Sequence, residues 1–148
     1  MKKFPVIILI VSLLVLCGCR ASEAGSFDLP AEPIRFKTGS YKNPDKAGDV
    51  YDAIQYGDKV YIPYGSVNND QMDERDIDAC LGYIARSDPD NRDIRVYTLA
   101  EDMKKNYVMI YNIENEISQA VFWRCTDTRY QKIETPGYID AIHYDYWE

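Results

Sequence analysis

Four cysteines carry the most distinctive chemistry in this chain, because a thiol can be acylated, oxidised to a disulfide or bound to a metal. Cys17 and Cys19 end a short apolar stretch near the start of the sequence, whereas Cys80 and Cys125 lie in its body. The sequence has no Cys-x-x-Cys motif, and its single histidine gives no zinc-binding pattern with these cysteines. The two pairs therefore predict two different modifications.

The first pair follows the parts of an export signal. Lys2 and Lys3 form a basic start, and the apolar run of residues 6–16 is shorter than the roughly 20 residues of a transmembrane helix. The run ends in Leu16-Cys17-Gly18-Cys19, which resembles the lipobox of bacterial lipoproteins. The resemblance implies that residues 1–18 are a signal peptide and that Cys19 carries a diacylglyceryl thioether. An ordinary secretory signal or an uncleaved anchor is the alternative.

A lipid on Cys19 would determine where the protein works. Two or three acyl chains, at about 0.8 kcal/mol for each buried methylene, make a durable anchor in the bilayer. The expected location is the cell envelope, on the outer face of the cytoplasmic membrane in a Gram-positive cell or in the outer membrane of a Gram-negative one. Arg20 is not the aspartate that resembles a signal for retention in the inner membrane.

The charge of the chain argues against several partners. Removing residues 1–18 takes away two lysines and no acid, so the formal net charge moves from −7 to −9. Such an acidic protein is unsuited to nucleic acid and is repelled by anionic headgroups. The sequence also has no phosphate-binding loop and no dinucleotide fingerprint. We therefore expect no nucleic-acid partner and no cofactor.

Cys80 and Cys125 are the two cysteines that would still carry free thiols after processing. An even pair outside the cytoplasm predicts a disulfide. Closing a loop of about 45 residues would stabilise the fold by roughly 4 kcal/mol in the chain-entropy model. The alternative is two separate buried thiols.

The body of the chain reads as a series of short strands. Residues 50–64 form two alternating runs around Gly57-Asp58, which predicts a tight hairpin, and further strands are expected at 77–86, 94–99, 107–113 and 119–125. With no long helical pattern, the sequence predicts an all-β fold, an antiparallel barrel or sandwich of about six to eight strands that could include a short C-terminal helix. The alternative is an α+β fold.

Composition also divides the chain into regions. Residues 19–49 are rich in Ser, Gly, Pro and charge, which predicts a lipidated and mostly flexible tether, although residues 34–38 alternate like a first edge strand. Residues 50–148 are expected to form one β-rich globular domain.

Aromatic side chains are the remaining candidates for binding. The chain has 13 tyrosines and two tryptophans. Trp123, Tyr144, Tyr146 and Trp147 could form an exposed platform that stacks on a sugar or anchors a protein partner. The alternative is that they fill the β core. Residues 138–147 carry so many large side chains that we expect this tail to pack on the sheet, the alternative being an exposed peptide that binds a partner.

No catalytic residue can be named from the sequence. His143 is the only histidine, and the acids are too numerous for any one pair to stand out. The leading interpretation is a non-enzymatic binding or protein-interaction module, such as an inhibitor or an envelope-stress protein, whose partner is an unknown protein or saccharide. The alternative is a small envelope hydrolase that uses acidic residues.

Overall fold

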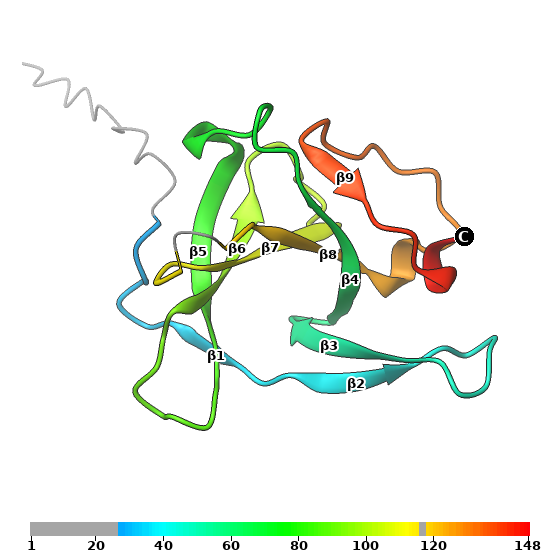
Figure 1. Ribbon diagram of the computed structural model, residues 1–148, viewed down its shortest axis with the longest axis horizontal. Helices are drawn as coiled ribbons and strands as arrows, with labels where there is room; N and C mark the ends of the chain where they lie inside the picture. The colour runs from blue at the N-terminus through cyan, green and yellow to red at the C-terminus, as the bar shows by residue number, and fades with distance from the viewer. Residues whose placement is uncertain (1–26, 116–117) are drawn as a thin grey trace, which may run out of the picture.

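The computed structural model describes residues 27–115 and 118–148 of the chain (Figure 1). In these residues 42% of positions are in strands and 8% in helical turns, and no helix reaches seven residues. The predicted all-β fold is thereby confirmed, and the α+β alternative does not apply to the described part of the chain. The predicted lipidation site at Cys19 and the predicted signal peptide lie outside the described residues.

Nine strands form one mixed sheet in the order β1-β5-β6-β7-β8-β4-β3-β2, with β9 paired to β4. Their bounds are β1 Ile34–Phe36, β2 Gly39–Lys42, β3 Val50–Tyr56, β4 Lys59–Val67, β5 Ile77–Ile84, β6 Ile94–Leu99, β7 Tyr107–Asn112, β8 Val121–Cys125 and β9 Ile139–Ala141. Single 3-10 turns lie at Glu74–Asp76, Thr126–Thr128 and Asp145–Trp147. The expected short C-terminal helix is present in the described residues only as the 3-10 turn at Asp145–Trp147.

The hairpin of β3 and β4 confirms the clearest sequence pattern. Tyr56 pairs with Lys59, so Gly57 and Asp58 form a two-residue turn, and Gly57 adopts a φ of 62°. A two-residue turn of this kind needs positive φ, which glycine adopts at little cost. The hairpin supplies one side of the curled sheet.

Strands β5 to β8 form an antiparallel meander whose two central strands, β6 and β7, are buried on both faces. Alternate residues of β6 and β7 enter two different cores: Tyr97 and Met109 lie on one face, and Val96 and Val108 on the other. Burial on both faces explains why β7 reads as an apolar run rather than as a strict alternation.

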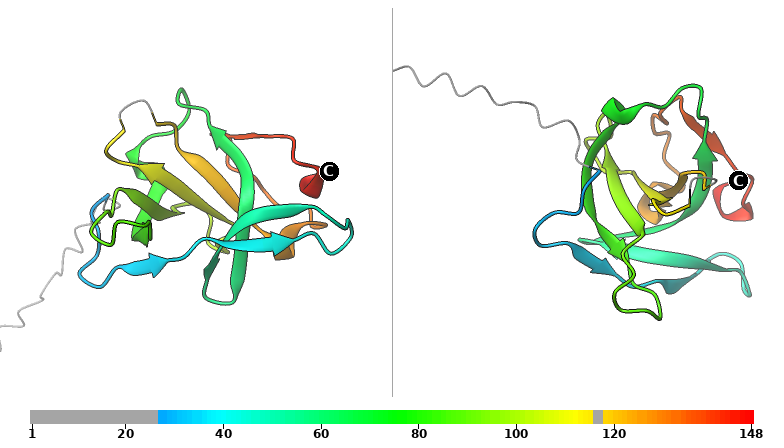
Figure 2. Two further views of the ribbon diagram at one scale, coloured as in Figure 1. Left: turned by 60° about the horizontal axis from the view of Figure 1, so that its bottom comes forward. Right: turned by 60° about the vertical axis from the view of Figure 1, so that its left-hand side comes forward.

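The sheet curls because one piece of chain reaches both of its ends. β1 pairs in parallel with β5, and β2 pairs with β3, yet only Lys37 and Thr38 separate β1 from β2. The result is an open, curled half-barrel (Figure 2). The parallel pairing departs from the antiparallel sheet that the sequence predicted.

This pairing also corrects the expected start of the domain. Residues 34–42 were expected to lie in a mostly flexible tether, but they supply two strands of the sheet, and Phe36 is only 2% exposed. Phe27 and Leu29 pack against the core as well. The folded unit therefore includes residues well before position 50. The few apolar side chains of this otherwise polar stretch are sufficient to pack it against the core.

The C-terminal segment packs on the sheet, as predicted. β8 occupies one edge of β4, while β3 and β9 share the other edge. Gly65 permits this approach, because a Cβ there would lie 2.4 Å from the carbonyl oxygen of Asp140. Tyr138 and Ile139 are buried in the same core as Tyr97.

The predicted disulfide is wrong. Cys80 and Cys125 are both buried and both free. Cys80 packs in the core with Tyr97, whereas Cys125 packs in the core with Val96, and neighbouring residues of a strand point to opposite faces of the sheet. The two thiols therefore lie on opposite faces, with strands β6 and β7 between their own strands. Burial raises the pKa of both thiols above the ordinary value.

Candidate functional site

The structure brings together three of the four aromatic residues proposed as a platform. Tyr144, Tyr146 and Trp147 lie in one ring cluster with Tyr51, but Tyr146 is only 2% exposed. Trp123 instead packs at the edge of the core that contains Cys125. These residues therefore form no single exposed surface.

Residues 144–147 close onto the sheet, and we call them the C-terminal clasp. The hydroxyl groups of Tyr146 and Tyr41 lie 3.0 Å apart, and their rings meet edge to face with centroids separated by 5.5 Å. The ring of Trp147 packs against that of Tyr64 at 5.6 Å. The aromatic residues at this end of the chain serve mainly to hold it in place.

A buried arginine lies beneath the clasp. Arg124 is 8% exposed, and its guanidinium carbon lies 4.8 Å from the ring centroid of Trp147 and 5.3 Å from that of Tyr64. Its Nε donates to the hydroxyl of Thr128 at 2.8 Å, and its Nη2 donates to the carbonyl of the same residue at 2.7 Å. Stacking and hydrogen bonds together compensate the burial of this charge.

A second arginine orders an exposed tyrosine. The guanidinium carbon of Arg129 lies 4.1 Å from the ring centroid of Tyr146 and 4.9 Å from that of Tyr130. Arg129 donates to Asp45 at 2.6 Å, and the hydroxyl of Tyr130 donates to the same carboxylate at 2.5 Å. That last hydrogen bond is the main cause of a raised pKa for Tyr130. Tyr130 nevertheless remains 79% exposed.

The ring of Tyr130 borders a depression that we call the Tyr130 hollow. It has a volume of about 390 Å³. Its lining is mixed aromatic and polar and consists of Tyr41, Pro44, Asp45, Thr126, Asp127, Arg129, Tyr130, Gln131 and Tyr146. Aromatic faces beside a few fixed polar groups are typical of ligand sites.

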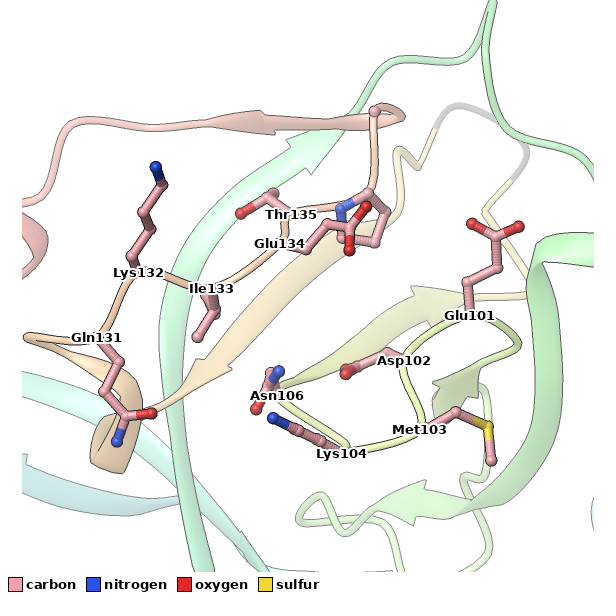
Figure 3. A pocket seen from close by; sticks show the side chains of 12 residues that line it. Glu101, Asp102, Met103, Lys104, Asn106, Gln131, Lys132, Ile133, Glu134 and Thr135 are labelled. Atoms are coloured by element: carbon pink, nitrogen blue, oxygen red, sulfur yellow. The ribbon is translucent and has the colours of Figure 1, made fainter.

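A larger cleft of about 590 Å³ lies next to this hollow, and we call it the polar cleft. The loop of residues 101–106 forms one wall and residues 131–137 form the other (Figure 3). The charged residues that line it are Glu101, Asp102, Lys104, Lys132 and Glu134. Gln131 lines both the polar cleft and the Tyr130 hollow, so the two depressions are neighbours.

Buried tyrosines fix both walls of the polar cleft. The carboxylate of Asp102 accepts a hydrogen bond from the backbone N–H of Tyr107 at 2.7 Å, and the hydroxyl of Tyr107 lies 2.7 Å from that of Thr135. Burial raises the pKa of Tyr107 to about 12. The hydroxyl of Tyr61 donates to the carbonyl of Lys105, which has a φ of 52°. Both walls are thus tied to the central strands.

A third depression, of about 410 Å³, is more apolar than the polar cleft, and its lining includes Phe27, Met72 and Met109.

His143 lies at the surface. Its side chain is 91% exposed, and its ring lies 3.2 Å from the carboxylate of Glu148. Within residues 27–115 and 118–148 no group of three or more His, Cys, Asp or Glu side chains could hold a metal ion. The same residues contain no helix that is long and apolar enough to span a membrane.

Neither Tyr130 nor either wall of the polar cleft was predicted from the sequence. The signal for Tyr130 was an aromatic residue between charged and polar neighbours, outside any alternating strand. The cleft gave no local signal, because its walls come from segments about thirty residues apart, which are brought together by tertiary contacts such as the pairing of β7 with β8 and the contact of Tyr107 with Thr135. In comparisons with known proteins, no protein-family model, no curated protein and no solved structure matches this chain.

Proposed function

We propose that this chain is a lipid-anchored, extracytoplasmic bacterial lipoprotein that acts as a non-enzymatic binding or protein-interaction module, with the polar cleft as its binding site. The observation that carries the binding role is the cleft itself, a concave surface of about 590 Å³ whose two walls are held by partly buried hydrogen bonds. A site that is already ordered loses less conformational entropy when a ligand binds.

The chemistry of the cleft supports a polar ligand. Three carboxylates and two lysines line it, together with the amides of Asn106 and Gln131. Such a lining offers many donors and acceptors and little apolar area, which suits a hydroxyl-rich small molecule or a polar loop of a protein partner. A docked loop would make the protein an inhibitor or a sensor of envelope stress.

The membrane anchor rests on the sequence around Cys19. Phe27, the first described residue, packs against the core, so residues 20–26 would be the link between the lipid and the folded unit. A link of seven residues spans at most about 25 Å. The binding surfaces would therefore work close to the bilayer that holds the lipid.

Two measurements test this proposal. Labelling of cells with radioactive palmitate should mark the wild-type chain and not the Cys19→Ala variant. Label on the variant would contradict the proposed lipid anchor. For the cleft, the double variant Lys104→Ala, Lys132→Ala should bind less of any envelope ligand or partner retained by the wild-type chain. Lys37→Ala, an exposed lysine outside the cleft, is the matched control.

A small hydrolase is the second candidate, because Glu101 and Glu134 line the same cleft from its two walls (Figure 3). Paired carboxylates can act as general acid and nucleophile or base in glycoside hydrolysis. In that case Glu101→Gln and Glu134→Gln would each abolish turnover of an envelope glycan while leaving its binding intact. Binding without turnover by the wild-type chain supports the binding module instead.

A further inference from the structure

We propose that the Tyr130 hollow is a saccharide-binding site, in which an uncharged pyranose ring stacks on the exposed face of Tyr130. This inference rests on the proposed function, since it names a ligand class for a binding module of the cell envelope. It concerns a surface separate from the charged walls of the polar cleft.

The first argument is the state of Tyr130 itself. An aromatic side chain that is 79% exposed would ordinarily sample several rotamers, but here the ring rests on the guanidinium of Arg129 and its hydroxyl is bound to Asp45. One face of the ring is therefore fixed against the protein and the other is presented to solvent. Folding has already ordered this surface, so a sugar ring that stacks there causes a smaller loss of conformational entropy.

The second argument is that the parts beneath Tyr130 are themselves rigid. Only 11% of the Arg129 side chain is exposed. Its Nε donates to the carbonyl of Tyr146 at 2.7 Å, and its Nη1 donates to Asn43 at 3.1 Å as well as to Asp45. The guanidinium of Arg129 thus lies over the rings of both Tyr146 and Tyr130, so Tyr130 rests on an ordered side chain and is not a loose surface residue.

The third argument is the polar rim and its charge. Asp127 and Gln131 line the hollow beside the tyrosine and supply the carboxylate and amide groups that hydrogen-bond sugar hydroxyls. Asp45 and Asp127 outnumber the single cation Arg129, so the hollow carries a net negative charge. A phosphate, sulfate or uronate group would be repelled there, so the charge of the hollow favours uncharged sugars as ligands.

The position of Gln131 suggests that the ligand is longer than one ring. The residue lines both depressions, and its amide nitrogen donates to the carbonyl of Asp127 at 2.9 Å. A linear oligosaccharide with one ring on Tyr130 can place its next units along residues 131–134, toward the polar cleft. Such a ligand would bury more area than the hollow alone provides.

The test uses the full lipidated chain, purified in a detergent without a sugar headgroup. Calorimetric titrations with chitopentaose and cellopentaose measure uncharged oligosaccharides, and a sulfated heparin pentasaccharide provides the anionic comparison. We expect at least one uncharged oligosaccharide to bind and the heparin fragment not to bind. Tyr130→Ala should weaken binding about tenfold or more, as loss of a stacked aromatic anchor does at a binding surface.

Two further variants separate stacking from structure. Tyr130→Phe keeps the ring and loses the hydroxyl, so it should retain much more affinity than Tyr130→Ala. Tyr144→Ala removes a half-buried tyrosine outside the hollow and should bind as the wild type does, provided that it melts as a folded protein. Binding that survives Tyr130→Ala unchanged, or preferential binding of the heparin fragment, would overturn the proposal.

The outcomes also distinguish this inference from the proposed function. If neither uncharged oligosaccharide binds, the proposed saccharide site is wrong. Palmitate labelling and the lysine variants of the polar cleft still test whether the chain is a lipid-anchored binding module. If the Cys19→Ala variant keeps its label but Tyr130→Ala loses the sugar, the anchor is wrong and the saccharide site stands.

Discussion

The indole Nε1 of Trp147 donates a hydrogen bond of 2.7 Å to the carbonyl oxygen of Pro63, a residue of β4. Proline interrupts the ladder of that strand, because it lacks an N–H group, and the pairing of β4 with β8 shifts register just after it. The clasp therefore covers the strand at the point where its regular pairing is weakest.

The first prediction follows from this contact. Trp147→Ala should lower the free energy of unfolding by about 2 kcal/mol or more, since it removes a packed ring, its stacking on Arg124 and a hydrogen bond. Urea denaturation measures the change. Ile142→Ala, at a residue that is 44% exposed in the same segment, is the control and should be nearly neutral. Equal effects of the two substitutions would show that the clasp adds little stability.

Arg124 gives the second prediction. Arg124→Lys keeps the charge but cannot donate to Thr128 from two nitrogens while also packing against the rings of Tyr64 and Trp147, so we expect a loss of about 2 kcal/mol. Arg75→Lys, at a side chain that is 90% exposed, should change stability by less than about 0.5 kcal/mol. Thermal melting of the two variants compares them directly, and a stable Arg124→Lys protein would contradict the prediction.

Gly82 gives the third prediction, because it allows β1 to join the sheet. A Cβ at Gly82 would lie 2.0 Å from the carbonyl oxygen of Ile34, a distance that backbone atoms cannot accept. Gly82→Ala should therefore displace β1 and cost about 1–3 kcal/mol, as overpacked sites do. Gly39→Ala is the matched control, since its Cβ would meet only a backbone oxygen at 4.0 Å. Hydrogen exchange at residues 34–36 should rise in the first variant alone.

The fourth prediction concerns alkaline pH. Burial raises the pKa of Tyr97 and Tyr107 to about 12, from an ordinary value of 10.0. Between these values the unfolded chain releases protons that the folded chain retains, so stability is complete below about pH 10 and falls as the pH rises toward about 12. Urea unfolding across this interval tests the slope. Tyr97→Phe should reduce it, and a stability that stays constant up to about pH 12 would contradict the prediction.

The sequence predicted those elements whose signals are local. The hairpin around Gly57 and the strand at 94–99 were expected and are present, because alternation and turn chemistry act over a few residues. The parallel pairing of Ile34 with Gly82 had no such signal, since it joins segments whose compatibility depends on the absence of one Cβ. The same holds for the cysteines, whose spacing permitted a disulfide but could not reveal on which face each thiol would lie.

The candidate site was less predictable than the fold. An abundance of aromatic residues near the C-terminus pointed to a platform, yet burial of Tyr146 depends on its partner Tyr41, far away in the chain. Tyr130 is exposed for the opposite reason, because Arg129 and Asp45 hold it at the surface. Composition identifies which residues are able to bind, whereas tertiary contacts decide which of them remain accessible.

The hydrogen bond between Tyr41 and Tyr146 joins residues 105 positions apart, and the ion pair of Lys46 with Asp145 joins residues 99 apart. A polypeptide that leaves a ribosome or an export channel with its N-terminus first would release Tyr41 long before Tyr146. During that interval strands β2 to β8 can already pair. Tyr41 and Tyr51, however, do not yet have the ring of Tyr146 against them, and Arg129 does not yet have the carbonyl of Tyr146 as its hydrogen-bond acceptor. The final steps of folding must therefore follow release of nearly the whole chain, and they leave a period in which this aromatic surface is open to chaperones.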